Sequence, residues 1–340
     1  MRRHFNIAPT PTCPGCRVEL RKLVSLGAPD SSGAADLDGF SGVVRDQAGR
    51  YYTWNHGRHS ILVYDSTGGF IRQLGRQGQG PGEFRGAGGV IRAGVNDSLF
   101  VLSSRELSVW TPDGKLARTV RLPSFAYSAH LIANGQLLVN ASIRTPEGAG
   151  FPLHLIDHAG DVLRSFGAAT AELRPQCMAC QIRVTSLATD QTSVWTALPD
   201  EYVLEKWSVN GRIERRLHVT GSSWFPHFTP EQRVNMRDVL SPITDLRQDA
   251  SGLLWVRGSL PEAIPVAPQG PQRGVTRGRP DLRIGTVLDV IDTKSGRLLV
   301  SKRFEDLTLH VMDGGLAYAP KADENGIVTI DILRVTLRTP

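Results

Sequence analysis

A spacing of 46 residues separates Gly68, Gly114 and Gly160, three glycines that occupy equivalent turns in similar segments of the chain. In each segment a short apolar strand leads into a polar turn, the glycine follows, and an alternating strand with an arginine comes next. Periods of about 40 to 50 residues are typical of propellers, whose blades each contain four strands. The spacing therefore predicts an all-β chain assembled from similar units.

A second kind of segment, a hairpin of two short apolar strands joined at a Gly, Asn or Asp turn, accompanies the first kind. The turn-glycine segment occurs five times and the hairpin six times. The hairpin copies begin at Val43, Val90, His130, Thr185, Thr244 and Leu309. Six hairpins predict six blades.

The last hairpin is followed by one long alternating stretch, residues 326–337, which needs a partner strand. Residues 17–27 resemble the final strand of a repeat, and pairing the two stretches would remove two exposed strand edges. We therefore predict a six-bladed β-propeller of four-stranded antiparallel blades, whose last blade is closed by the N-terminal strand. Residues 1–16 are expected to form an N-terminal tail and residues 17–340 a single propeller domain.

Residues 78–84, with the sequence Gly-Gln-Gly-Pro-Gly-Glu-Phe, directly follow a strand-like stretch. Three glycines and a proline cannot continue a strand or a helix, so the chain turns here, and Phe84 can anchor the next unit. The Lys-Ser/Thr pair of a phosphate-binding loop is missing, which argues against a nucleotide site. The segment is predicted to link two blades.

The pattern from Gly75 to Phe84, preceded by Val63-Tyr64-Asp65 and a turn glycine, resembles the NHL repeat. The wider pattern, over residues 17–338, is similar to bacterial six-bladed propellers of the NHL-like and TolB-like kind. The resemblance implies a non-catalytic binding or scaffolding module that recognises a protein or a small ligand. We expect no cofactor, and the resemblance favours export from the cytoplasm.

The net charge of +6 raises the question of a nucleic-acid partner. Six of the 39 basic residues are lysine and the rest are arginine, and they are spread along the whole chain. A nucleic-acid footprint would gather them on one element or face. Nucleic acid is therefore not an expected partner, and we expect a monomer.

Four cysteines form two C-x-x-C pairs, Cys13 with Cys16 and Cys177 with Cys180. A zinc ribbon separates its pairs by about 15–20 residues, whereas 160 residues lie between these two. Disulfides within or between the pairs, a zinc site and inert thiols remain open from the residues alone, and thioredoxin-like redox chemistry lacks its strand-to-helix context. The resemblance to exported propellers favours disulfides.

The N-terminus has the positive charge of a signal peptide but lacks the apolar stretch of about 7–15 residues that should follow. Either the protein is cytoplasmic, or its signal peptide is absent from this sequence. The resemblance favours a periplasmic or secreted protein. No apolar run reaches the roughly 18 residues of a transmembrane helix, so no transmembrane segment is expected.

Three ionisable residues of the predicted innermost strands, His130, Asp245 and His310, come from different blades. If they converge near the axis, they could bind a metal or act as acid and base, as in a hydrolase or lyase acting on a small ester, lactone or peptide-like substrate. A one-residue error in register would turn any of them away, and structural roles are the alternative. We assign no residue to catalysis or to a metal.

Tryptophans within the predicted strands are expected to pack between blades. Trp224 and Phe225 lie instead in a longer connection between the fourth and fifth blades, where a loop can reach solvent. These two aromatic residues are therefore candidates for ligand contact.

Overall fold

The computed structural model describes residues 3–27, 37, 39–84, 89–94, 97–103, 105–132, 134–141, 143–145, 148–149, 151–167, 183–198, 201–226, 242–260, 285–324 and 326–340. Within these ranges the regular structure consists of β-strands. The strands are β1 (Arg3–Ile7), β2 (Arg17–Leu26), β3 (Phe40–Arg45), β4 (Tyr51–Asn55), β5 (Ser60–Tyr64), β6 (Phe70–Leu74), β7 (Gly89–Ala93), β8 (Leu99–Ser103), β9 (Glu106–Trp110), β10 (Leu116–Arg121), β11 (Ala126–Leu131), β12 (Leu137–Ala141), β13 (Arg144–Thr145), β14 (Gly148–Ala149), β15 (Leu153–Ile156), β16 (Val162–Phe166), β17 (Val184–Leu187), β18 (Ser193–Ala197), β19 (Val203–Ser208), β20 (Ile213–Val219), β21 (Ile243–Gln248), β22 (Leu253–Leu260), β23 (Gly285–Asp292), β24 (Arg297–Phe304), β25 (His310–Met312), β26 (Leu316–Ala322) and β27 (Val328–Arg338).

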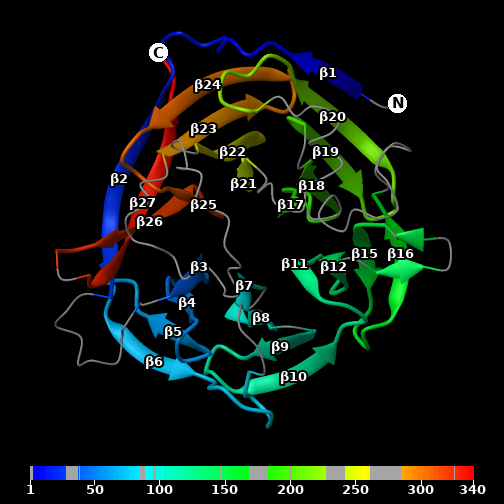
Figure 1. The fold of residues 1–340 in the computed structure, drawn as a ribbon, viewed down its shortest axis with the longest axis vertical. Coiled ribbons are helices and arrows are strands. Elements are labelled where there is room, and N and C mark those ends of the chain that lie inside the picture. The colour runs from blue at the N-terminus through cyan, green and yellow to red at the C-terminus, as the bar shows by residue number, and fades with distance from the viewer. Residues whose placement is uncertain are drawn as a thin grey trace, which may run out of the picture.

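Six antiparallel sheets of four strands stand around a common centre, which confirms the predicted six-bladed propeller (Figure 1). The blades, numbered from first to sixth, are β3-β4-β5-β6, β7-β8-β9-β10, β11-β12-β15-β16, β17-β18-β19-β20, β21-β22-β23-β24 and β25-β26-β27-β2. The first strand named in each blade lies nearest the centre, and the last lies on the outside (Figure 1).

The blades pack face to face, and six clusters of buried apolar residues fill the six interfaces between neighbours. Every residue of the middle strands β4 and β5 is buried, because both faces of a middle strand meet another blade. The outer strand β6 alternates between exposed and more covered positions, since its edge faces water. A continuous apolar run in the sequence thus indicates a middle strand of a blade, and an alternating pattern indicates an outer strand.

The linker of residues 78–84 connects β6 of the first blade with β7 of the second, as predicted. Gly75 has a φ of +68°, and a Cβ at this position would overlap the ring of Phe84. Phe84 is 3% exposed, and its ring centroid lies 4.9 Å from that of Trp54 and 5.9 Å from that of Trp110. The glycines serve backbone geometry, and Phe84 joins the first two blades.

Ring closure follows the predicted scheme, because β2 pairs antiparallel with β27 from Arg17 opposite Arg338 to Leu26 opposite Ile330. A buried carboxylate fastens the pair: Asp331 accepts a hydrogen bond from Ser25 Oγ at 2.6 Å and ion pairs from Lys22 at 2.8 Å and Lys321 at 2.5 Å. Burial alone would raise the pKa of Asp331, but these three donors lower it to about 2. The ring is therefore closed both by backbone hydrogen bonds between β2 and β27 and by the ion pairs of Asp331.

We expect Asp331→Asn to lower the free energy of unfolding by about 1–2 kcal/mol at pH 7, a figure reduced because both lysines are half exposed. The folded pKa, about 2, lies below the ordinary value of 3.8. The carboxylate's contribution is therefore present above pH 3.8 and is lost as the pH falls toward 2. Urea unfolding at pH 7 and 2.5 measures this; Asp161→Asn, at an exposed turn, is the control. A loss as large at pH 2.5 as at pH 7 would contradict the role of the charged groups around Asp331.

The N-terminal segment, residues 1–16, includes a strand. β1 adds to the outer edge of β20 in parallel, so the fourth blade carries a fifth strand. Figure 1 shows the chain then crossing outside β24 before it enters β2. Cys13 and Cys16 form a disulfide on this path, whereas Cys177 and Cys180 lie outside the described residues. No helix long and apolar enough to cross a membrane occurs in the described ranges.

Candidate functional site

Two of the three predicted axial residues, Asp245 and His310, lie on the innermost strands of neighbouring blades. Asp245 is the third residue of β21, and His310 is the first residue of β25. Because side chains alternate along a strand, Gln248 of β21 faces the fourth blade, where its Oε1 accepts from Trp195 Nε1 at 3.1 Å. Asp245, on the opposite parity, faces the sixth blade.

The imidazole of His310 and the carboxylate of Asp245 meet directly, with Nδ1 and Oδ2 3.1 Å apart. The ring of Tyr318 stacks on the imidazole with centroids 4.6 Å apart and planes at 7°, which fixes the orientation of His310. The two side chains retain exposed fractions of 27% for His310 and 19% for Asp245. The imidazole and the carboxylate are therefore fixed against each other, remain accessible to solvent, and lie on the innermost strands of two neighbouring blades.

Arg257 of β22 lies behind this pair and is 4% exposed. Its Nη1 donates to Thr244 Oγ1 and lies 3.7 Å from Asp245 Oδ2. The buried Nε has no hydrogen-bond partner among the described residues. A donor without a partner in a buried guanidinium is unusual, since desolvating it costs free energy.

The charges around Asp245 keep it ionised. Burial raises the pKa of the carboxyl, but the hydrogen bond from His310 and the positive charges of His310, Arg257 and Arg247 outweigh burial and hold the pKa below its ordinary value. Arg247 also pairs with Asp313 of the sixth blade, at 3.3 Å. The inner interface of these blades thus presents an anion and two guanidinium groups close together. We call Asp245, His310, Arg257 and Tyr318 the axial cluster.

His130 does not join the axial cluster. Its Nε2 lies 2.8 Å from Thr185 Oγ1, which in turn lies 2.6 Å from Ser128 Oγ. His130 belongs to the third blade and Thr185 to the fourth, so one complete blade stands between His130 and Asp245. In the described ranges no group of three His, Cys, Asp or Glu side chains is arranged to hold a metal.

The sequence suggested that Trp224 and Phe225 reach solvent, but both side chains are buried. They are 8% and 9% exposed and pack with Tyr202, whose ring centroid lies 5.1 Å from Trp224 and 5.4 Å from Phe225. Trp224 Nε1 donates to Asp289 Oδ2 at 3.0 Å, so even its polar edge is occupied. These residues fill the interface of the fourth and fifth blades.

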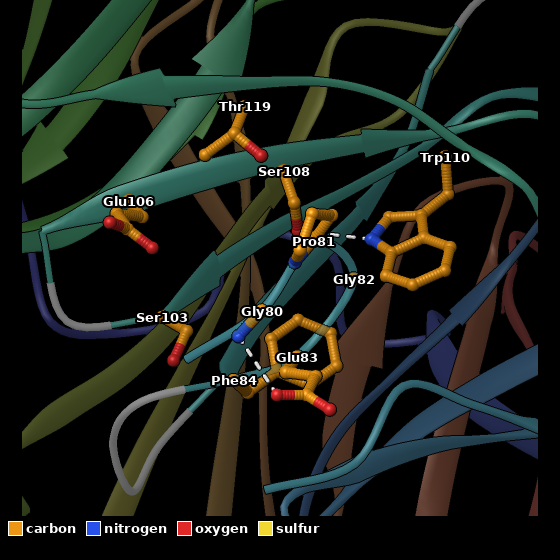
Figure 2. Close-up of a pocket in the computed structure, with 10 residues that line it drawn as sticks. All are labelled: Gly80, Pro81, Gly82, Glu83, Phe84, Ser103, Glu106, Ser108, Trp110 and Thr119. Carbon is orange, nitrogen blue, oxygen red and sulfur yellow. Dashed lines mark hydrogen bonds between the residues drawn. The ribbon is translucent and has the colours of Figure 1, made fainter. Parts of the chain in front are cut away.

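A cavity of about 40 Å³ lies beside the linker of the first two blades, with Ser103, Glu106, Ser108 and Thr119 in its wall. In Figure 2, Glu83 turns back to Gly80 and the indole of Trp110 points to Ser108. These contacts are hydrogen bonds of 2.8 Å, from Gly80 N, and 3.0 Å, from Trp110 Nε1. A space of this size suits one or two water molecules and not an organic ligand.

Two members of the axial cluster, Arg257 and Tyr318, were not singled out from the sequence. Arg257 carried a usable signal, because a charge interrupts the apolar run Leu253-Leu254-Trp255-Val256 of an otherwise buried strand. A charge in such a position needs partners on a neighbouring element. Tyr318 carried no comparable signal, since an aromatic residue in a middle strand reads as core.

Comparisons with known proteins agree with the architecture. Residues 40–173 match the DUF5128 family model, described as a 6-bladed beta-propeller. No curated protein matches the sequence significantly.

Similar solved structures include a Bacteroides fragilis protein described as exported, with 11% identity and a TM-score of 0.59, covering 99% of this chain and 100% of that one. A DUF4221 family member from Bacteroides vulgatus has 10% identity and a TM-score of 0.63, covering 95% and 99%. Virginiamycin B lyase from Staphylococcus aureus has 11% identity and a TM-score of 0.53, covering 94% and 100%. At such identities the likeness extends to the fold: this chain is a six-bladed β-propeller.

Proposed function

We propose that this chain is a recognition propeller that binds a small polar ligand at the axial cluster, between the fifth and sixth blades. The contact of His310 with Asp245 carries the proposal. Two ionisable side chains from different blades are fixed against each other at 3.1 Å, yet both keep access to solvent. Ligand sites in proteins place a few oriented polar groups within an otherwise apolar frame, and the blade interface provides that frame.

The charges of the site favour a ligand that carries both a donor and an acceptor. Asp245 offers an ionised carboxylate, and the guanidinium groups of Arg257 and Arg247 place positive charge beside it. Asp245 would repel a ligand that carries only negative charge, and Arg257 and Arg247 would repel one that carries only positive charge. A free amino acid or the end of a short peptide has both groups.

Proton NMR with a defined panel of amino acids and dipeptides tests the proposal. We expect saturation transfer from the protein to at least one compound, with affinity reduced by about tenfold or more in Asp245→Asn and His310→Gln. Glu324→Gln, which removes one negative charge at an exposed position, is the matched control and should bind like the unaltered protein. Equal binding by all four proteins would refute the axial site.

A second candidate function, proton transfer in a hydrolase or lyase, is favoured by the same imidazole–carboxylate pair. A carboxylate at Nδ1 orients the imidazole and stabilises its protonated form, as a general base requires. Small esters, lactones and peptide-like compounds added to the same NMR samples distinguish the two functions. Unchanged spectra with binding support recognition, whereas product signals that disappear in His310→Gln support catalysis.

We further propose that the protein works outside the cytoplasm as a monomer. The Cys13–Cys16 disulfide supports an oxidising compartment, and so does likeness to a propeller described as exported. The NHL-like linker agrees with a recognition role. Mass measurement of the protein from its own cells, before and after reduction, tests the compartment, because a reduced pair would contradict it.

A further inference from the structure

The disulfide between Cys13 and Cys16 lies within a single turn and joins no two blades. The two residues are three positions apart in the sequence. Cys16 N also donates to Cys13 O at 3.0 Å, so a backbone hydrogen bond closes the same span. Both cysteines are partly exposed, and Pro14 and Gly15 between them are exposed. The disulfide is therefore a surface feature of the N-terminal segment.

Other contacts hold the segment in place on both sides of the disulfide. Thr12 donates to Leu298 O twice, from N at 2.8 Å and from Oγ1 at 3.0 Å. β2 begins at Arg17 and pairs with β27 along its length. Gly15 packs on the last residue of the chain, since a Cβ there would lie 2.6 Å from Pro340 Cγ. We therefore expect the segment to keep its position when the sulfur–sulfur bond is broken.

A disulfide in this position contributes little to the stability of the fold. A disulfide stabilises a protein mainly by restricting the unfolded chain, and the effect grows with the length of the loop that it closes. The loop between Cys13 and Cys16 is short, and it does not link distant parts of the chain. Exposed disulfides are also the ones that exchange with thiols, whereas structural disulfides resist reduction. Breaking and re-forming this bond is therefore compatible with a folded propeller.

The two sulfurs have different surroundings. Cys16 packs against the apolar cluster between the fifth and sixth blades. Cys13 contacts no such cluster in the part of the chain that the structure describes, and it lies on the segment that crosses outside β24 (Figure 1). Because access decides which sulfur of a disulfide is attacked, the attacked sulfur is that of Cys13.

We propose that Cys13 and Cys16 form a redox-active disulfide that accepts two electrons from thiols outside the chain while the propeller stays folded, with Cys13 as the exchanging sulfur. The pair precedes the strand β2 and not a helix, so no helix dipole activates a thiolate, and the attacking thiolate belongs to the external reductant. This activity does not depend on the axial cluster.

The exchange proceeds in two steps. An external thiolate attacks Cys13 Sγ, the bond between the two protein sulfurs breaks, and Cys16 leaves as a thiolate that takes up a proton. A second external thiolate then attacks the external sulfur of the mixed disulfide and releases the thiolate of Cys13. Two external thiols are thus oxidised to one disulfide, and the protein disulfide is reduced to two thiols.

The first test uses the full chain with Cys177→Ser and Cys180→Ser, so that one pair of cysteines remains. We expect dithiothreitol at pH 8 to reduce this pair completely without denaturant, and oxidised glutathione to restore it. The midpoint of thermal unfolding should differ by less than about 3 °C between the two forms. If these serines prevent folding, differential alkylation of the unaltered chain with peptide mapping gives the same comparison.

The second test adds either Cys16→Ser or Cys13→Ser, and each of these variants is the matched control of the other. Mass spectrometry after mixing with oxidised glutathione should show the mixed disulfide at Cys13 forming about tenfold faster than the one at Cys16. Equal rates would contradict the role of Cys13. A pair that stays oxidised until denaturant is added, or a larger fall in the unfolding midpoint on reduction, would show a structural disulfide and overturn the proposal.

Discussion

Phe84→Ala is expected to lower the free energy of unfolding by about 3–5 kcal/mol, the usual range for removing a buried aromatic ring. Phe84 is 3% exposed and touches an aromatic residue of each blade that it joins, Trp54 and Trp110. The backbone cannot close the resulting cavity, because Gly78 N donates to Phe84 O at 3.1 Å and Phe84 N donates to Arg76 O at 2.8 Å. Both indoles would lose their shared contact.

Urea unfolding followed by the fluorescence of the six tryptophans, which include Trp54 and Trp110, measures this loss. Phe125→Ala makes the same chemical change where the ring is 51% exposed, so its effect should stay within about 1 kcal/mol. A similar loss in both variants would mean that the linker ring does not join the blades. The unfolding midpoint and slope should be compared together, since a changed slope would show that one blade unfolds separately.

The fold was predictable because its signals are local. Gly68, Gly114 and Gly160 recur at a fixed spacing since each turn needs the left-handed backbone, and their φ values are +89°, +83° and +101°. The closing strand was predictable because an outer edge at one end of the chain and a long alternating strand at the other each lacked a partner. Predicting the repeated blades and the closing strand pair therefore requires no knowledge of side-chain contacts between distant parts of the chain.

The site was predictable in part. Placing Asp245 and His310 on inner strands followed from the repeats, but which way each side chain turns depends on register, and a shift of one residue would reverse it. His130 occupies the same class of strand, yet its partner Thr185 is supplied by the blade that separates it from Asp245. Composition and spacing do not encode such cross-blade partners.

The burial of Trp224 and Phe225 and the addition of β1 could not be predicted, because both depend on contacts far along the chain. Trp224 is buried since Asp289, 65 residues later, accepts its indole hydrogen. β1 spans five residues, too few for a reliable alternating pattern, and its anchoring depends on a glycine in the fifth blade. A loop-like or tail-like composition therefore does not exclude a core position.

Trp224→Ala is expected to cost about 3–5 kcal/mol, because it removes a buried indole from the interface of the fourth and fifth blades and leaves a cavity beside Tyr202. Part of this loss of unfolding free energy comes from the hydrogen bond between Trp224 and Asp289. Asp289 is 1% exposed, and its Oδ2 accepts from Tyr202 at 2.7 Å as well as from Trp224 at 3.0 Å. The variant deletes one of these two donors and exposes the carboxyl to an empty space.

Trp224→Phe helps to separate the two parts, since it removes the donor but keeps an aromatic ring in the interface. Burial raises the pKa of Asp289 above its ordinary value of 3.8, and the donors oppose that rise. Removing one donor raises the folded pKa further, so the ionised form becomes costlier in the folded state. The penalty of Trp224→Phe should therefore be largest at pH 7 and should shrink as the pH falls toward 3.8, because the folded Asp289 takes up its proton above that value. Urea unfolding at pH 7 and pH 4 measures the difference. A penalty that is equal at both pH values would show that ring volume alone, and not the carboxyl, accounts for the role of Trp224.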